Sequence, residues 1–200
     1  ASHFSKTREY AWPEVESFVT DRSADRALDV GCGNGRHAEL LAQRADAVVG
    51  VDLSRELLRE AVHRARERGY DETASFVHGD AARLPVATDA VGLAVYVATI
   101  HHLPSRAARI GSLDELARVL APGGTALVST WSTAHDRFER DAGFDTTVDW
   151  TLPGGETVPR YYHIYAPSEF EADLAESALE TVSFEVSSGN CYATVTASTP

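Results

Sequence analysis

The sequence predicts a doubly wound α/β fold with a mostly parallel sheet that closes with an antiparallel C-terminal strand. Short apolar runs alternate along the chain with segments of helical periodicity. A glycine-rich turn follows the first apolar run, where such sheets place a tight connection from strand to helix. The 200 residues, 44% of them hydrophobic, suffice for one core and are too few for two ordinary domains. We therefore expect a single domain over residues 1–200.

The first half of the chain predicts two pairs of strand and helix. We expect strands at Ala27–Val30 and Ala47–Val51, because both runs are short and apolar. Residues 36–45 keep apolar side chains at helical spacing. Ser54 is a suitable N-cap for a second helix that reaches Gly69, since its hydroxyl can accept from the free amides of the first turn.

The middle of the chain continues this alternation. Further strands are expected at Ser75–His78, Val91–Val97 and Thr125–Trp131, with a helix over Ser105–Leu120 between the last two. Repeated βαβ units favour parallel strands with helices on both faces of the sheet.

The C-terminal part predicts a hairpin. A helix over Ser168–Leu179 precedes two strand-like runs, Thr181–Ser187 and Cys191–Thr196. Gly189-Asn190 between them suits a tight turn, so an antiparallel strand should close the sheet.

Two segments lie outside the regular alternation. Residues 1–22 are expected to form a helical N-terminal extension. Residues 132–160 are polar and contain Pro153-Gly154-Gly155 and Pro159, which favours turns over regular elements. We expect a substrate-side loop or lid over residues 132–166.

The charge balance is strongly acidic. The chain has 30 acidic and 18 basic residues, a net charge of -12, and Lys6 is its only lysine. This composition resembles that of proteins from salt-loving archaea. Such a charge repels polyphosphates in dilute salt, but at molar salt the Debye length falls to about 3 Å and the repulsion is largely screened.

Neither a membrane nor a metal site is indicated by the sequence. The apolar run Val91–Ile100 stops well short of the roughly 20 residues that span a bilayer, and no secretory signal is visible, so we expect a cytoplasmic protein. Cys32 and Cys191 lie far apart and neither belongs to a C-x-x-C pair. We therefore expect no disulfide framework and no self-contained zinc site.

A nucleotide-binding edge is predicted where the expected strands end. Glycines in the loop Asp29–Gly35 let the backbone approach a ligand, Asp52 can accept both ribose hydroxyls of an adenosine, and Asp80 can accept from the adenine amino group. A nicotinamide dehydrogenase would show G-x-G-x-x-G, whereas the third glycine here comes one residue earlier. Asp29 suits an ammonium better than a pyrophosphate. The predicted cofactor-binding residues are Asp29, Gly31, Cys32, Gly33, Asn34, Gly35, Asp52, Leu53, Asp80, Ala81 and Val97.

These residues, together with Val119–Gly124, resemble the class I S-adenosylmethionine-dependent methyltransferases, which implies a Rossmann-like fold and that cofactor. Five further motifs resemble the tRNA wobble-uridine carboxymethyl methyltransferases: His3–Arg8, Ile100–Leu103, Ser129–Ser132, Arg160–Tyr165 and Ser188–Tyr192. This resemblance implies esterification of the carboxylate of 5-carboxymethyluridine in the tRNA anticodon loop. It also implies a heterodimer with a small zinc-ribbon activator protein, for which the expected contact is the third-strand edge near Ser75–Val77.

The predicted acceptor pocket draws on distant parts of the chain. We expect one of His101 and His102 to face the substrate, and Trp131 to stack on an unpaired base. Asn190 is either a substrate contact or only a turn residue. Arg160 and His163 are candidates from the polar lid. The predicted catalytic residues are Arg8, His101, His102, Trp131, His163 and Asn190, with Arg8 and His163 holding a carboxylate.

Two other functions remain open from the sequence. A small-molecule methyltransferase of the same fold would methylate metabolites without tRNA or a partner protein. A noncatalytic cofactor-binding scaffold would bind the cofactor without turnover. In the methyltransferase interpretation no metal is required, because methyl transfer from a sulfonium depends on alignment in a cleft that excludes water.

Overall fold

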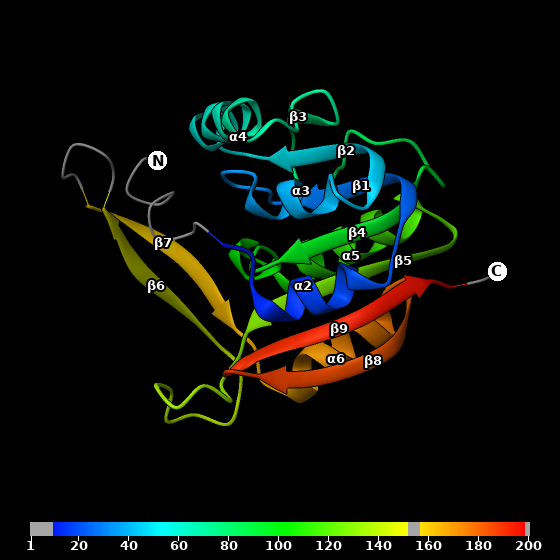
Figure 1. Ribbon diagram of the computed structural model, residues 1–200. Coiled ribbons are helices and arrows are strands. Elements are labelled where there is room, and N and C mark those ends of the chain that lie inside the picture. The colour runs from blue at the N-terminus through cyan, green and yellow to red at the C-terminus, as the bar shows by residue number, and fades with distance from the viewer. Residues whose placement is uncertain (1–9, 152–156, 199–200) are drawn as a thin grey trace.

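The computed structural model describes residues 10–151 and 157–198. Its main sheet has seven strands in the order β3-β2-β1-β4-β5-β9-β8 (Figure 1). Strands β3, β2, β1, β4 and β5 are parallel, while β9 is antiparallel to both β5 and β8, which confirms the predicted fold class. The strands are β1 Ala24–Val30, β2 Ala45–Asp52, β3 Ala74–His78, β4 Val91–Val97, β5 Leu120–Trp131, β8 Leu179–Ser187 and β9 Asn190–Ala197.

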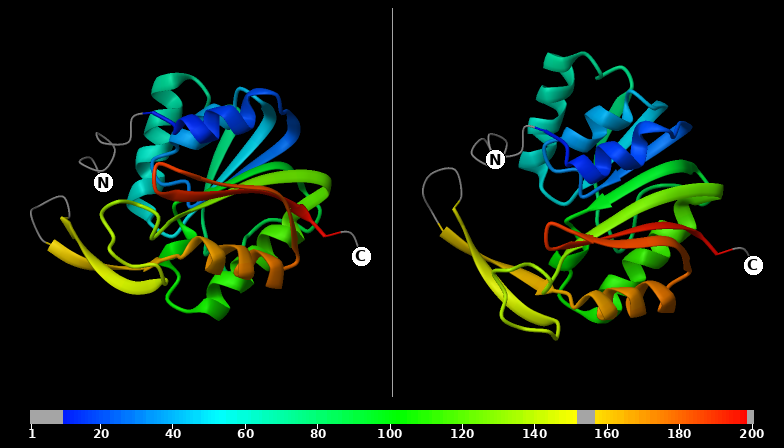
Figure 2. Two further views of the ribbon diagram at one scale, coloured as in Figure 1. Left: turned by 90° about the horizontal axis from the view of Figure 1, so that it is seen from below. Right: turned by 60° about the horizontal axis from the view of Figure 1, so that its bottom comes forward.

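Helices cover both faces of this sheet (Figure 2). One face carries α2 Pro13–Thr20, α3 Arg36–Leu41 and α4 Arg55–Arg68, and the other carries α5 Arg106–Val119 and α6 Pro167–Glu176. The Ser54 hydroxyl accepts from the Leu57 amide at the start of α4, as predicted for this N-cap. In the described part of the chain, no helix is long and apolar enough to cross a membrane.

The helix predicted over residues 36–45 is shorter than expected. Helix α3 ends at Leu41 rather than at residue 45, and the Ala24 amide donates to the Arg44 carbonyl across the turn that follows. Ala45 then begins β2 opposite Ala24, so pairing of two parallel strands overrides local helical periodicity. The predicted N-terminal extension, residues 1–22, contains α2 near its end, and residues 1–9 lie outside the described residues.

The largest difference from the sequence prediction lies in residues 132–160. Strands β6 Phe144–Thr151 and β7 Thr157–Ile164 pair as an antiparallel hairpin that extends away from the main sheet (Figure 1). The expectation of a segment without regular elements was therefore wrong. Pro159, opposite Asp149, is compatible with a strand here because each strand of a two-stranded sheet has a free edge.

The C-terminal turn is displaced by one residue from the predicted dipeptide. Ser188 and Gly189 have φ values of 50° and 76°, the left-handed conformation that a two-residue hairpin turn of this kind requires. Asn190 is the first residue of β9 and pairs with Ser187 and with Trp131. Of the two roles left open for Asn190, that of a central turn residue is excluded, because the residue lies directly after the turn.

Candidate active site

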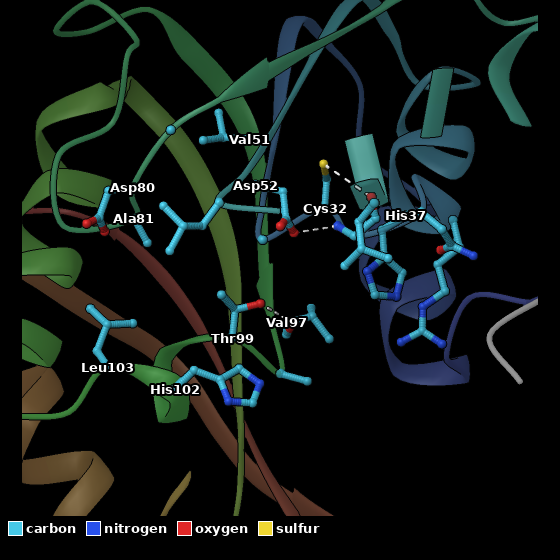
Figure 3. A pocket seen from close by; sticks show the side chains of 18 of the residues that line it. Cys32, His37, Val51, Asp52, Asp80, Ala81, Val97, Thr99, His102 and Leu103 are labelled. Carbon is cyan, nitrogen blue, oxygen red and sulfur yellow. Dashed lines mark hydrogen bonds between the residues drawn. The ribbon is translucent and has the colours of Figure 1, made fainter. Parts of the chain in front are cut away.

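A cleft of about 270 Å³ lies at the carboxyl ends of β1, β2 and β4, the edge at which the sequence predicts nucleotide binding (Figure 3). Most of the predicted cofactor-binding residues line it: Gly31, Cys32, Gly33, Asn34, Asp52, Leu53, Asp80, Ala81 and Val97. The other two are the end residues of the loop: Asp29 is buried at the end of β1, and the Gly35 carbonyl accepts from the Tyr70 hydroxyl.

The loop backbone is held tightly against the neighbouring strand and against Thr99. The Gly31 and Cys32 amides both donate to the Val51 carbonyl, at 2.7 and 3.0 Å. Gly31 has a φ of 71°, and a Cβ at this position would lie 2.1 Å from Thr99 Oγ1. Both the backbone conformation and this close approach require glycine.

Asp52 joins the loop to the start of α4. One carboxylate oxygen accepts from the Gly33 amide at 2.8 Å (Figure 3). The other accepts from the Ser54 amide at 2.7 Å. A carboxylate oxygen can accept a second hydrogen bond, so the half-buried group keeps acceptor capacity toward the cleft. This is the chemistry that a ribose diol needs.

Asp80 lies on the other side of the cleft from the glycine loop (Figure 3). It follows β3 by two residues, and its Oδ1 accepts from the Ala82 amide at 2.9 Å. Its side chain is exposed at the rim, and Ala81 beside it also lines the cleft. The position fits an acceptor for an exocyclic amine.

The buried carboxyl group of Asp29 tests whether the site suits a cationic ligand. Neither carboxylate oxygen has a hydrogen-bond partner of normal geometry among the described residues, and the backbone amide of Ala38 has only a small effect on the group. Burial raises the pKa of Asp29 to about 7, with a smaller contribution from Asp52, against the opposing effect of Arg36. A ligand that brings an ammonium group to this end of the cleft would compensate the buried charge, so these residues fit the amino-acid part of S-adenosylmethionine.

The two adjacent histidines have different environments, as predicted. His102 lines the cleft, and its Nδ1 lies 3.1 Å from the Tyr161 carbonyl oxygen. His101 is 1% exposed, and its Nδ1 accepts from the Trp131 amide at 3.2 Å. Both belong to the 3₁₀ turn η1, Ile100–His102, rather than to the end of β4. His102 is therefore the histidine that faces the cleft.

Among the residues that the structure describes, the other predicted acceptor residues do not line the cleft. His163 is buried between two carboxylates, with Nδ1 2.7 Å from Asp145 and Nε2 2.9 Å from Glu169. The Trp131 ring stacks on Tyr162 at a centroid distance of 4.7 Å, and the Arg137 guanidinium also lies over it. Asn190 pairs with Trp131 in the sheet, and Arg8 lies outside the described residues.

The cleft also contains polar side chains that the predicted cofactor set lacks: Arg36, His37, Thr99 and Arg160. Arg36 and His37 directly follow the glycine loop, so their position in the sequence was a usable signal. Arg160 comes from β7, and its place in the cleft depends on the hairpin. Because the hairpin was not predicted, the sequence could name Arg160 only as a candidate from a polar lid.

Comparison with known proteins identifies the family. A family model described as a methyltransferase domain matches residues 27–124. The tRNA (carboxymethyluridine(34)-5-O)-methyltransferase of Mus musculus is 35% identical over 133 residues, which are 66% of this chain and 18% of that protein. A protein of Encephalitozoon cuniculi (strain GB-M1) named as a methyltransferase is 33% identical over 170 residues, 81% of this chain and 74% of that protein.

Solved structures share the whole fold. A SAM-dependent methyltransferase from Methanosarcina mazei matches with a TM-score of 0.74 at 21% identity, over 96% of this chain and 100% of that chain. The topology, the cleft with its strand-end carboxylates and these matches agree with the predicted family. The chain belongs to the methyltransferase family and has the fold of its S-adenosylmethionine-dependent members.

Proposed function

We propose that this chain is an S-adenosylmethionine-dependent tRNA methyltransferase that esterifies the carboxylate of 5-carboxymethyluridine at the wobble position. The observation that carries this proposal is the placement of Arg160 and His102 in the same cleft as Asp52 and Asp80. A guanidinium beside the cofactor site suits an acidic acceptor, because it can bind a carboxylate through two charge-assisted hydrogen bonds. The likeness to the mouse tRNA methyltransferase supports the same substrate, although the chain spans only 18% of that protein.

The chain's own residues need only orient the acceptor and exclude water. Bound S-adenosylmethionine supplies an electrophilic methyl group. A carboxylate has a pKa of about 4 and is already ionised at neutral pH, so no side chain has to remove a proton. Arg160 would hold one face of the carboxylate and leave an oxygen free to attack. His102 lines the same cleft, with Nδ1 3.1 Å from the Tyr161 carbonyl oxygen, and would help to position the base or sugar of the acceptor.

This assignment changes the role proposed for His163. Two carboxylates flank its ring, so the residue is suited to fix the root of the hairpin that carries Arg160 rather than to hold a substrate carboxylate. We keep Arg8 as a second candidate cation for the acceptor.

Single-turnover methylation of tRNA containing 5-carboxymethyluridine tests the assignment. Arg160→Ala should slow transfer by about 100-fold through misalignment, while cofactor affinity stays within about twofold. Arg26→Ala, at the exposed amino end of β1, is the control and should retain the wild-type rate. If Arg160→Ala and His102→Ala both retain wild-type rates, the acceptor pocket lies elsewhere and a small-molecule acceptor becomes the better account. Cofactor binding without transfer to any acceptor would instead favour a noncatalytic scaffold.

We further propose a small zinc-ribbon activator protein as partner, and a cytoplasmic location in a salt-loving archaeon. Strand β3 is one edge of the sheet and exposes Val77, so a partner could add a strand there. Val77→Asp should weaken co-elution with the activator, whereas Val182→Asp on β8, the opposite edge, should not. Full tRNA methylation by the rigorously purified single chain would contradict a required partner.

A further inference from the structure

The segment between β3 and β4 forms the adenine side of the cleft. It carries Gly79, Asp80 and Ala81, all of which line the cleft. Near Asp80, the Gly79 amide donates to the Asp52 carbonyl at 3.1 Å, and the Arg83 amide donates to the Asp80 carbonyl at 3.0 Å. At the far end of the segment, the Asp89 and Ala90 amides donate to the carbonyls of Arg118 and Val119, at 3.0 and 2.9 Å. The position of Asp80 therefore depends on what holds the rest of the segment.

Arg118 on α5 holds that segment through three of its oxygen atoms. Its guanidinium donates to the carbonyls of Leu84 and Val86, at 3.2 and 3.0 Å, and to the Thr88 hydroxyl at 3.2 Å. The remaining donors form a two-point contact with Glu115, at 2.7 and 2.8 Å. An arginine with this many oriented partners acts as a rigid connector.

Glu115 binds the same segment through a backbone amide. Its Oε2 accepts from the Leu84 amide at 2.8 Å. The hydrogen bonds from Arg118 hold the pKa of Glu115 below its ordinary value, so the pair stays ionised near neutral pH. Both the amide and the carbonyl of Leu84, whose side chain is buried, are thus bound to one ion pair on α5.

Packing links the bound segment around Leu84 to Asp80. Pro85 follows Leu84, and a Cβ built on Gly79 would lie 2.9 Å from the Pro85 ring and 2.9 Å from Val51. Gly79 therefore has no space to shift between the anchored segment and β2. Asp80 is the next residue, so movement at Leu84 and Pro85 would reach it directly.

We propose that Glu115 and Arg118 are positioning residues that fix Asp80 and Ala81, and so set the affinity and selectivity of the cleft for the adenine of the cofactor. Neither residue lines the cleft. This inference concerns cofactor binding alone and does not depend on which acceptor is methylated.

Calorimetric titration with S-adenosylhomocysteine, and with its 6-oxo analogue that carries hypoxanthine, tests the proposal. The wild-type protein should prefer the adenine compound, because a carboxylate accepts from an amine and repels a carbonyl oxygen. Arg118→Ala should weaken binding of S-adenosylhomocysteine by about tenfold or more and reduce the preference between the two compounds, because Asp80 is no longer fixed. Glu115→Gln keeps the side-chain shape and should likewise weaken binding of S-adenosylhomocysteine and reduce the preference for it. This variant provides the test if Arg118→Ala folds poorly.

Arg106→Ala is the matched control. Arg106 lies on the same helix and, like Arg118, forms ion pairs. Its partners are Asp173 at 2.7 Å and Glu176 at 2.6 Å, which belong to α6 and do not line the cleft. It should leave the affinity for both compounds within about twofold of wild type. Equal losses for the two compounds in Arg118→Ala, or an unchanged preference in Arg118→Ala and in Glu115→Gln, would overturn the proposal.

Discussion

Asp29 gives the folded chain an ionisable group whose protonation depends on the state of folding. Its pKa is raised from 3.8 to about 7 by burial, whereas the unfolded chain ionises it in the ordinary range. Between about pH 4 and pH 7 the folded state holds more protons at this site than the unfolded state, so stability falls as pH rises and levels off above about pH 7. Asp29→Asn should therefore raise the thermal midpoint above about pH 7 and leave it nearly unchanged near pH 4.

Thermal unfolding across this pH range checks the prediction, in the absence of cofactor. Asp25→Asn, which replaces an exposed carboxylate on the same strand, serves as the control. It should leave the thermal midpoint unchanged both near pH 4 and above about pH 7. A constant difference between Asp29→Asn and wild type at all pH values would show that Asp29 does not titrate in this way. The same variant should bind S-adenosylmethionine more weakly, because the buried countercharge is gone.

Asp52 is the residue whose loss should affect the cofactor most specifically. Asp52→Ala removes the acceptors for the ribose and should weaken cofactor binding by about 1.5–3 kcal/mol, the usual range for hydrogen bonds to charged groups. Calorimetry measures the change, with exposed Asp46→Ala on the same strand as the control. Unchanged affinity, or a preference for a nicotinamide nucleotide, would refute the assignment.

For single residues, the sequence correctly placed those that lie at or just after the end of a strand. Asp52 and Asp80 fall in the cleft because parallel strands bring their carboxyl ends to one edge. The environment of His163 could not be predicted in the same way. Its two carboxylate partners, Asp145 and Glu169, come from β6 and from α6, and only the folded hairpin brings them together.

The hairpin β6–β7 is the element that carries Arg160 into the cleft. His163, at its root, contacts Asp145 on the opposite strand and Glu169 on α6. His163→Ala should loosen this root and slow methyl transfer by about 10- to 100-fold through misplacement of Arg160, while cofactor affinity stays unchanged. Rate and affinity measured on the same preparation separate the two effects.

Tyr161→Phe provides the comparison for this element. It removes the other side-chain hydrogen bond to Asp145, at 2.7 Å, but leaves both His163 contacts in place. A smaller rate loss than in His163→Ala is expected. A loss of cofactor affinity in His163→Ala would contradict the positioning role.

The sequence carried a partial signal for this hairpin. Thr146, Thr147 and Val148 are β-branched and favour a strand, but Asp145 and Asp149 flank them and Pro159 lies in the second strand. A strand pair outside the main core buries little apolar surface, so it lacks the apolar runs that identified β1, β2 and β4. Polar strands of this kind are easily taken for a loop.

For the molecule as a whole, alternation of apolar runs and helical segments was enough to predict the sheet. Strand ends were less certain, because pairing extended β1 back to Ala24 and β2 back to Ala45, beyond the apolar runs. The main sheet was predictable because its central strands, such as β4 and β5, are buried on both faces, and their composition reflects this burial.

The net charge of -12 predicts how the whole molecule responds to salt. Like charges repel in the compact state, and added salt screens this repulsion. The thermal midpoint should therefore rise between about 0.1 and 2 M potassium chloride, with most of the rise at the low end, where the Debye length changes most. Sodium chloride should act similarly if screening is the cause. A midpoint that falls with salt would contradict the charge argument and the proposed habitat.

Nucleoside mass spectrometry of tRNA after reaction tests the central claim most directly. Substrate tRNA containing 5-carboxymethyluridine is incubated with the protein, the zinc-ribbon activator and S-adenosylmethionine carrying a labelled methyl group, and is then digested to nucleosides. We predict that the label appears as the methyl ester of 5-carboxymethyluridine and is lost on mild alkaline hydrolysis, as an ester requires. Label on a base nitrogen or carbon that survives alkali, or an unlabelled tRNA beside a labelled small molecule, would contradict the account.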